Sequence, residues 1–148
     1  MKVRDVMSAN PVCCVPEDTA QKVAQIMCDH NIGSVPVILD QESRELLGMI
    51  TDRDLCCSVI AAGLDSRTTQ IKEFVGVHFV VTCRDGENVD KCEKAMQEHQ
   101  VRRIPVVDGD NRVIGIVAQA DVALKDKPDR VSQTVKAISD NKRSSIAA

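Results

Sequence analysis

Apolar and polar positions along this chain follow one order of elements that is written twice. In the first copy, a short β-rich run at 13–15 precedes a stretch, 17–31, in which apolar residues recur at helical spacing. This spacing predicts an amphipathic helix that Asp18 caps and whose apolar stripe consists of Ala20, Val23, Ala24 and Met27. The elements that follow are β-rich runs at 34–39 and 46–51 and a second helix, 52–62, that ends at Gly63.

The second half repeats this order. A β-rich run, HFVVT (78–82), precedes a predicted helix over 88–99 whose apolar side carries Val89, Cys92 and Met96. Two further runs, RIPVVD (103–108) and RVIGIVA (112–118), flank a polar turn, and a short helix is expected to begin near Asp121. Beyond this copy, 128–138 predicts a helix with proline in its first turn, and residues from 141 onward are expected to fray.

Matching residues support a duplication. IMCDHNIGSVPV (26–37) aligns with AMQEHQVRRIPV (95–106). The paired residues are Met27 with Met96, His30 with His99, Pro36 with Pro105, Val37 with Val106, Gly48 with Gly115 and Asp54 with Asp121. We therefore divide the chain into repeat 1 (1–64), repeat 2 (65–127) and a C-terminal helix with a flexible tail (128–148).

A single repeat is too small to bury both faces of its sheet. Two copies placed sheet to sheet can bury these faces together. We therefore expect an α/β fold in which two β-α-β-β-α repeats are related by a pseudo-twofold axis. Such an axis leaves two equivalent clefts, which are the natural places to look for binding residues.

The strand-to-helix junctions carry the most specific candidate chemistry. GMITDRDL (48–55) places Thr51 at the end of a strand and Asp54 in the first turn of the next helix. A helix start offers unpaired N–H groups and a partial positive charge, both of which suit a phosphate. The hydroxyl can donate one more hydrogen bond, and the carboxylate can accept a pair from the hydroxyls of a ribose. The pair could therefore bind a nucleotide. Simple helix capping is the usual explanation of an isolated T-x-x-D, but the arrangement here follows the same glycine-led strand in both repeats, which favours a functional role.

These paired motifs resemble those of tandem cystathionine-beta-synthase (CBS) domains, also called Bateman modules. The resemblance rests on IGSVPVIL…LLGMITDRDL in repeat 1 and VRRIPVVD…RVIGIVAQADV in repeat 2, and it spans about 3–124. Phrases such as EHQVRRIPV and VKAI are similar to those of stand-alone bacterial CBS pairs of the hypoxic response type.

The resemblance implies binding of an adenosine compound (AMP, ADP, ATP or S-adenosylmethionine), with no cofactor required. It places phosphate against Thr51 and ribose against Asp54, with Asp121 as the ribose acceptor of the second cleft. It also implies that adenine pockets are lined by Ser34 and Val35 in repeat 1 and by Arg103 and Ile104 in repeat 2. Arg53, between the two motif residues, is a further candidate for the phosphate. The resemblance also implies a homodimer, and we expect its interface on the helix after Thr51, at Cys57, Val59 and Ile60.

Repeat 2 departs from this pattern at one position. Ala118 stands where a threonine or serine is expected, while Asp121 is retained. One hydrogen bond to a charged group contributes about 1.5–3 kcal/mol, so its loss weakens binding roughly tenfold to more than a hundredfold. We therefore expect one stronger cleft in repeat 1 and one weaker, altered or empty cleft in repeat 2. Arg102 and Arg103 could restore part of the attraction for phosphate.

Bulk composition narrows the class of protein. The 148 residues carry a net charge of −3 and only 1% aromatic residues, which argues against nucleic acid as a partner. No apolar run reaches a membrane-spanning length, and no export signal stands at the start, so we expect a cytoplasmic protein without a membrane partner.

The seven cysteines are interpreted mainly as reduced thiols in apolar positions, because Cys13–Cys14 and Cys56–Cys57 lack metal-knuckle spacing. His30 and His99 are expected to interact with helix C-termini, although a zinc site that combines a histidine with Cys28 or Cys92 across a dimer stays open. No nucleophile motif indicates catalysis, and we expect neither catalytic nor metal-binding residues.

The sequence therefore predicts a non-catalytic regulatory module that senses an adenine nucleotide for an unknown partner protein. Two alternatives remain: a dimeric interaction scaffold with empty clefts, and a metal or thiol-redox sensor.

Overall fold

A computed structural model describes residues 1–75, 80–125 and 127–140. The chain forms two compact units. The repeat-1 unit consists of Pro11–Val80 with Gly109–Val113, and the repeat-2 unit consists of Met1–Asn10, Val81–Asp108 and Ile114–Ala148. Of the helices in the described ranges, none is long and apolar enough to span a bilayer.

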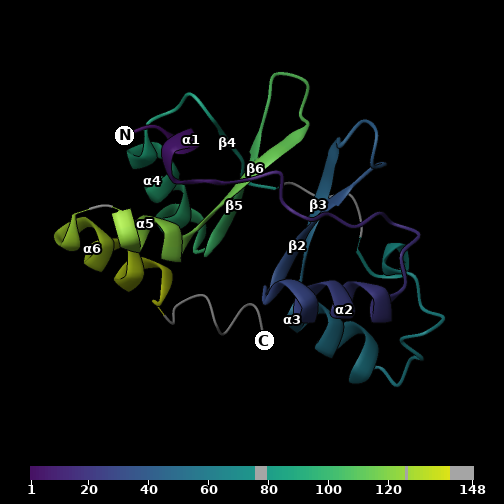
Figure 1. The fold of residues 1–148 in the computed structure, drawn as a ribbon. Helices are drawn as coiled ribbons and strands as arrows, with labels where there is room; N and C mark the ends of the chain where they lie inside the picture. The colour runs from purple at the N-terminus through teal and green to yellow at the C-terminus, as the bar shows by residue number, and fades with distance from the viewer. Residues whose placement is uncertain (76–79, 126, 141–148) are drawn as a thin grey trace. The chain divides into compact units, whose positions relative to one another are not determined.

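In the repeat-1 unit, two antiparallel strands lie against two helical segments (Figure 1). Strand β2 (Ser34–Ile38) pairs with β3 (Leu46–Thr51), with an irregularity in register between Val37 and Ile38. The helices are α2 (Ala20–His30), α3 (Asp52–Leu55) continuing into the π-helical turn η1 (Cys56–Ile60), and the 3-10 turn η2 (Ile71–Glu73).

In the repeat-2 unit, a four-stranded sheet has the order β1-β6-β5-β4. Its strands are β1 (Ser8–Ala9), β4 (Cys83–Arg84), β5 (Arg103–Val107) and β6 (Val113–Ala118). Its helices are α1 (Val3–Val6), α4 (Val89–His99), α5 (Gln119–Lys125) and α6 (Pro128–Ile138). Strand β1 is antiparallel to β6, and β4 is parallel to β5.

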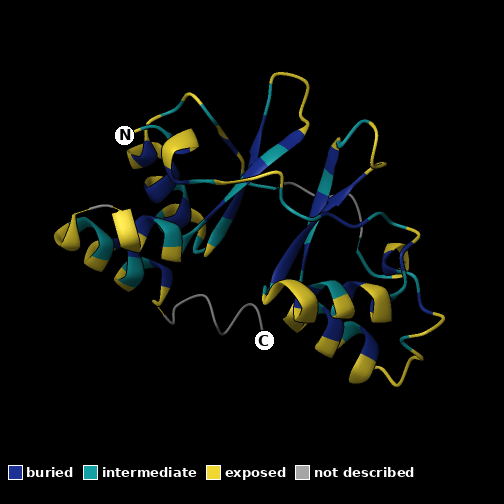
Figure 2. Cartoon of the chain, in the orientation of Figure 1, coloured by how far each residue is buried: buried dark blue, intermediate teal, exposed yellow. Residues whose placement is uncertain are grey.

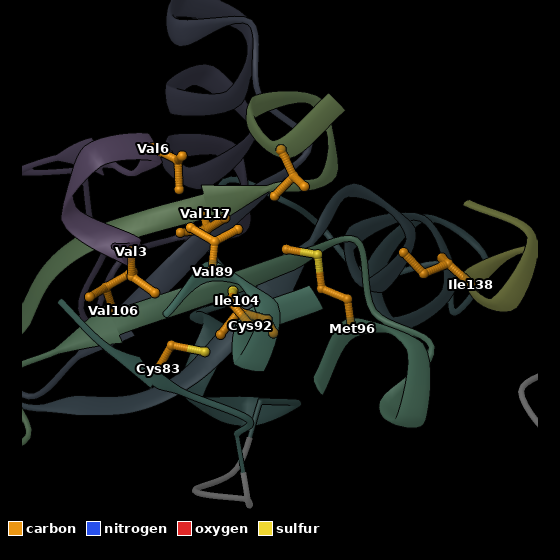
Figure 3. Close-up of a cluster of buried hydrophobic side chains, with 11 residues drawn as sticks. Val3, Val6, Cys83, Val89, Cys92, Met96, Ile104, Val106, Val117 and Ile138 are labelled. Carbon is orange, nitrogen blue, oxygen red and sulfur yellow. The ribbon is translucent and has the colours of Figure 1, made fainter. Parts of the chain in front are cut away.

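Each unit has its own hydrophobic core, to which the strands and the inner faces of the helices contribute (Figure 2). The repeat-1 core includes Val23, Val35, Ile50 and Ile71, all with no exposed surface. The repeat-2 core gathers Val3, Cys92, Met96 and Ile104, which are likewise fully buried (Figure 3). The alternation of buried and half-buried residues in β3 and β6 shows that one face of each strand is packed more tightly than the other.

Most of the predicted elements are confirmed. The long helices, the four main strands and the helix over Pro128–Ile138 lie where the sequence patterns place them. Of the predicted apolar stripe of α2, Ala20, Val23 and Met27 are buried and Ala24 is half-buried. The predicted fraying from residue 141 lies outside the described residues.

Three local predictions are wrong. Thr19, not Asp18, caps α2, since its hydroxyl accepts a hydrogen bond from Lys22 N (3.2 Å); the Asp18 carboxylate instead accepts one from Val15 N (3.0 Å). The run 13–15 forms only one bridge, between Cys14 and Val37. In the described part of HFVVT, residues 80–82 form no strand, and the pairing begins at Cys83; residues 78–79 lie outside the described ranges.

The N-terminal residues pack with repeat 2 and not with repeat 1. Val3 N donates to Glu87 O (2.9 Å) and Val89 N donates to Met1 O (3.1 Å), so the first residues are held by the turn before α4. The turn 109–113 likewise joins the repeat-1 unit, through Leu46 N to Asn111 O (3.0 Å). The predicted boundaries at 64 and 127 describe the duplication and stay a prediction, because the compact units exchange these short segments.

Candidate functional site

At the first candidate site, strand β3 passes into α3 without an intervening loop. Thr51 has extended backbone angles (φ −113°, ψ 163°) and is the N-cap of α3. Its hydroxyl oxygen accepts a hydrogen bond from Asp54 N (3.2 Å), and Asp54 Oδ2 accepts one from Thr51 N (2.8 Å). This reciprocal arrangement is a capping box, so both motif residues have a structural role.

The capping box leaves hydrogen-bonding capacity unused. Within the described part of the chain, Asp54 Oδ1 and the hydroxyl proton of Thr51 have no hydrogen-bond partner. Both residues are half-buried, so neither belongs to the fully buried core. The junction thus offers one hydroxyl donor and a carboxylate with accepting capacity, three residues apart on one helical turn.

Strand pairing places Ser34 next to this junction. Ser34 is the direct cross-strand partner of Thr51, so the two side chains lie on the same face of the ladder. Asp52 N donates to Gly33 O (3.0 Å), which fixes the end of β2 against the start of α3. Ser34 itself is only 7% exposed. The predicted residues Ser34, Thr51 and Asp54 are therefore brought together.

The remaining repeat-1 candidates are placed differently. Val35 is fully buried in the core, so its predicted contact with an adenine ring stays a prediction. Arg53 is exposed, and among the described residues its guanidinium has no partner. Its main-chain N–H is bonded to Asp52 Oδ1 (2.9 Å). A free guanidinium beside a helix start is available to an anion.

The repeat-2 junction reproduces the same main-chain geometry with one group fewer. Asp121 Oδ2 accepts from Ala118 N (2.8 Å), as Asp54 Oδ2 does from Thr51 N. Gln119 N donates to Arg102 O (2.8 Å), as Asp52 N does to Gly33 O. Ala118 has no hydroxyl to complete the box.

The two β5 candidates of repeat 2 differ in exposure. Arg103 is half-buried at the start of β5, beside β6. Ile104 is fully buried in the repeat-2 core. As with Val35, its predicted role in lining a pocket stays a prediction.

The cysteines and histidines show no metal centre in the described ranges. No three His, Cys, Asp or Glu side chains there are grouped so as to hold a metal ion. His30 and His99 end helices α2 and α4, the position expected for a positive charge near a helix C-terminus. All seven cysteines are free thiols. Burial raises the pKa of the Cys14 thiol to about 12, which makes it unreactive at neutral pH.

Sequence reasoning missed the main-chain bonds that hold both junctions and the placement of Cys83 beside Cys92 in the repeat-2 core. The junction bonds join a carbonyl before one strand to an N–H after the next, and no residue type signals such a pair. The helix after Thr51 also differs from expectation: Val59 is 1% exposed, so it belongs to the core and not to a dimer face, whereas Ile60 is 72% exposed.

Comparison with known proteins identifies the duplicated unit. The family model of the CBS domain matches residues 3–60 and 72–126. Hypoxic response protein 1 of Mycobacterium tuberculosis is 36% identical over 137 residues, which cover 91% of this chain and 92% of that protein.

Solved structures support the same assignment to the CBS-domain family. The crystal structure of Hypoxic Response Protein I with two coordinated zinc ions has a TM-score of 0.73 at 35% identity and covers 86% of this chain and 100% of that one. The CBS domain pair of protein MJ0100, in complex with 5-methylthioadenosine and S-adenosyl-L-methionine, has a TM-score of 0.71 at 28% identity, with 84% and 94% covered. The α/β fold, the duplication and the paired motifs thus have one explanation: the chain belongs to the CBS-domain family and is a tandem pair of CBS domains.

Proposed function

We propose that this CBS pair is a regulatory module that binds an adenosine compound at the repeat-1 junction. The observation that carries the proposal is the unused capacity of Thr51 and Asp54, beside Ser34, at the start of α3. The carboxylate suits the hydroxyls of a ribose, and the hydroxyl with the helix start suits a phosphate or another acceptor on the ligand. The ligands in the MJ0100 structure, both adenosine compounds, support this choice.

The two junctions are proposed to bind unequally. Repeat 1 offers a hydroxyl donor and the unpaired Arg53, whereas repeat 2 has Ala118 in place of the hydroxyl. A hydrogen bond to a charged group contributes about 1.5–3 kcal/mol, which corresponds to about one to two orders of magnitude in affinity. The repeat-1 site is therefore the stronger, and AMP, ADP, ATP and S-adenosylmethionine are the ligands to test.

We propose that ligand binding changes the conformation of the protein and so regulates a partner, and that the protein does not catalyse a reaction on the ligand. A ligand shifts a conformational equilibrium only by its difference in affinity for the two states. The segment from α3 through η1 begins at the Thr51 junction and ends at Ile60, which is 72% accessible; Leu64, four residues further on, is 49% accessible. This exposed face is proposed as the homodimer contact, and a change in α3 on binding would reach it directly. The regulated partner protein is left open.

A thermal-shift panel tests ligand binding. We expect at least one of AMP, ADP, ATP or S-adenosylmethionine to raise the Tm, since a ligand at one hundred times its Kd adds about 2.7 kcal/mol of stability. Asp54→Asn keeps an acceptor for Thr51 N but removes the charge and one accepting oxygen, so the shift should largely disappear. Asp121→Asn is the matched control and should retain the shift. Equal loss in both variants, or no shift with any of the four, contradicts the proposal.

An interaction scaffold with empty junctions is the second candidate. It is favoured by the exposure of Ile60 and of Leu124, which is 85% accessible on α5, together with the missing hydroxyl at Ala118. A protein that dimerises through these residues but gives no shift in the ligand panel supports this candidate.

Zinc is not part of the proposal. The structure of Hypoxic Response Protein I holds two zinc ions, but the described residues of this chain offer no group of three ligands for one. Metal analysis of protein purified without a histidine tag checks this point.

A further inference from the structure

Two cysteine side chains lie next to each other in the repeat-2 core (Figure 3). Cys83 belongs to β4 and Cys92 to the first turns of α4, and both side chains are in the buried cluster shown in Figure 3. Cys83 is 2% exposed and Cys92 is fully buried. Neither residue takes part in the proposed nucleotide site.

The chain between the two cysteines is held in place from several sides. Arg84 N donates to the Glu87 carboxylate (3.0 Å), and Arg4 N donates to Asp85 O (3.0 Å). Val3 N donates to Glu87 O (2.9 Å). These hydrogen bonds hold the turn between β4 and α4, so the two cysteines stay near each other even when the short strand β4 separates locally from β5.

The two thiols are not equivalent. The neighbouring Cys92 thiol lowers the pKa of the Cys83 thiol, against burial and the negative charge of Glu87, which both raise it. The neighbouring Cys83 thiol and burial raise the pKa of Cys92. Cys83 therefore ionises first, and Cys92 retains its proton.

The other buried pair provides a contrast. Cys13 and Cys14 are adjacent in sequence, and burial raises the pKa of both thiols. The Cys13 sulfur accepts a hydrogen bond from Arg44 Nη2 (3.4 Å), and the Cys14 thiol donates to Pro36 O (3.7 Å). Each of these thiols is bonded to a different partner, so they are not arranged to react with each other.

We propose that Cys83 and Cys92 form a reversible disulfide when the protein meets a peroxide. The Cys83 thiolate attacks one peroxide oxygen: the S–O bond forms, the O–O bond breaks, and the leaving hydroxide takes up the proton that Cys83 lost, as water. The Cys92 sulfur then attacks the sulfenic sulfur: the S–S bond forms, the S–O bond breaks, and the leaving hydroxide takes the Cys92 proton. Two thiols lose two electrons and the peroxide is reduced to two waters.

Access to the pair comes through β4. This strand has two residues and lies at the edge of the sheet; in the described part of the chain it pairs with β5 alone, through Cys83–Val106 and Arg84–Val107. Short edge elements open locally at low cost. Because the buried pair reacts only when β4 opens, its oxidation is slower than that of the exposed thiols of Cys28, Cys56 and Cys57. These three cysteines are therefore replaced in the test protein.

The test uses the full chain carrying Cys28→Ser, Cys56→Ser and Cys57→Ser, treated with hydrogen peroxide and then alkylated. Trypsin cuts after Lys72, Arg84, Lys91 and Lys94, so Cys83 and Cys92 fall in separate peptides, 73–84 and 92–94, each with no other cysteine. We expect a linked species two hydrogens lighter than the sum of these peptides, which dithiothreitol separates. The Tm should rise on oxidation and return on reduction.

Controls keep the outcomes distinct. Cys92→Ser should abolish the linked species and leave Cys83 as a trappable sulfenic acid, whereas Cys13→Ser should leave the linked species unchanged. The intact three-serine variant needs no further substitution in the core, so a folding failure of Cys92→Ser does not prevent the main measurement. Recovery of both peptides alkylated after peroxide treatment, or linkage to Cys13 or Cys14 instead, overturns the proposal. The disulfide proposal is independent of nucleotide binding, so a failure of the nucleotide proposal would not affect it.

Discussion

At the scale of single residues, one hydroxyl group distinguishes the two junctions. Asp54 and Asp121 accept the same main-chain hydrogen bond at the same distance, 2.8 Å, from Thr51 N and Ala118 N. Only Thr51 adds a hydroxyl, and it serves both the cap and the proposed ligand contact. The difference between the repeats is therefore chemical and not a difference of backbone.

Ala118→Thr should convert the second junction into a copy of the first. The new hydroxyl can accept from Asp121 N, which should stabilise the fold by about 0.5–1 kcal/mol, and its proton becomes available to a ligand. We expect urea unfolding to show the gain in stability and calorimetry to show a second binding event. In the control Ala118→Val, the side chain has nearly the shape of threonine but no hydroxyl, so we expect neither the gain in stability nor the second binding event. Equal gains in both variants would contradict the assignment.

At the scale of elements, the attachment of α6 to α4 is largely polar. Arg130 Nη2 donates to the Glu93 carboxylate (2.8 Å) and also contacts Asp90, and Gln97 donates to the Thr134 hydroxyl (2.8 Å). Glu93 is 3% exposed and Thr134 is 1% exposed, so these contacts lie inside the helix pair. A helix held in this way depends on the charges of its neighbours.

The Arg130–Asp90 contact makes a prediction about pH. The hydrogen bond from Arg130 lowers the pKa of the Asp90 carboxyl, so folding favours the ionised form. The contribution to stability is present above the ordinary pKa of about 3.9 and is lost as the pH falls through the lowered value. NMR titration should find the pKa of Asp90 below its ordinary value in the wild type and near it in Arg130→Gln. An unchanged value in the variant would exclude this contact in solution.

Strand β1 illustrates an element that depends on one small residue. Its Ala9 pairs with Gly115 of β6, and a Cβ on Gly115 would lie 2.5 Å from Met7 Sδ and 3.3 Å from Ser8 O. Gly115→Val should therefore destabilise the protein by about 1–3 kcal/mol, measured by urea unfolding.

Met7 provides the matched control for this prediction. Adding Met7→Ala removes the nearest atoms, so the double variant should lose less than the sum of the two single changes. Strict additivity would show that the close approach does not determine the cost.

Periodicity and repeat matching predict most of the elements in this chain, because each long helix and main strand buries one side. Periodicity does not predict the strands β1 and β4, because two residues are too few to show a period. It also does not predict that the N-terminal residues pack with repeat 2, because this is a long-range contact. At the site, residue types predict the meeting of Thr51 with Asp54. They cannot reveal that the pair already forms a capping box, because this depends on backbone geometry.

At the scale of the whole molecule, the two cores are separate. One contains Val35 and Ile50 next to the first junction, and the other contains Ile104 and Val117 next to the second. Each unit therefore has its own supply of buried apolar surface, and a ligand at one junction acts first on the unit that holds it.

Hydrogen exchange should reveal this local effect. With a ligand from the adenosine panel, we expect slower exchange at amides around 33–35 and 51–55, and a smaller change around 102–104 and 118–121. Asp54→Asn should remove the protection. Protection centred on the repeat-2 segments would reverse the assignment of the stronger site.

The most direct test of the central claim is isothermal titration calorimetry of the adenosine compound that gives the largest thermal shift. Because Thr51 and Asp54 provide the more complete set of groups, we predict one strong binding event per chain in the wild type. Asp54→Asn should weaken it at least tenfold, while Asp121→Asn leaves it in place. Two equal events per chain, or a strong event that survives Asp54→Asn, would contradict the account.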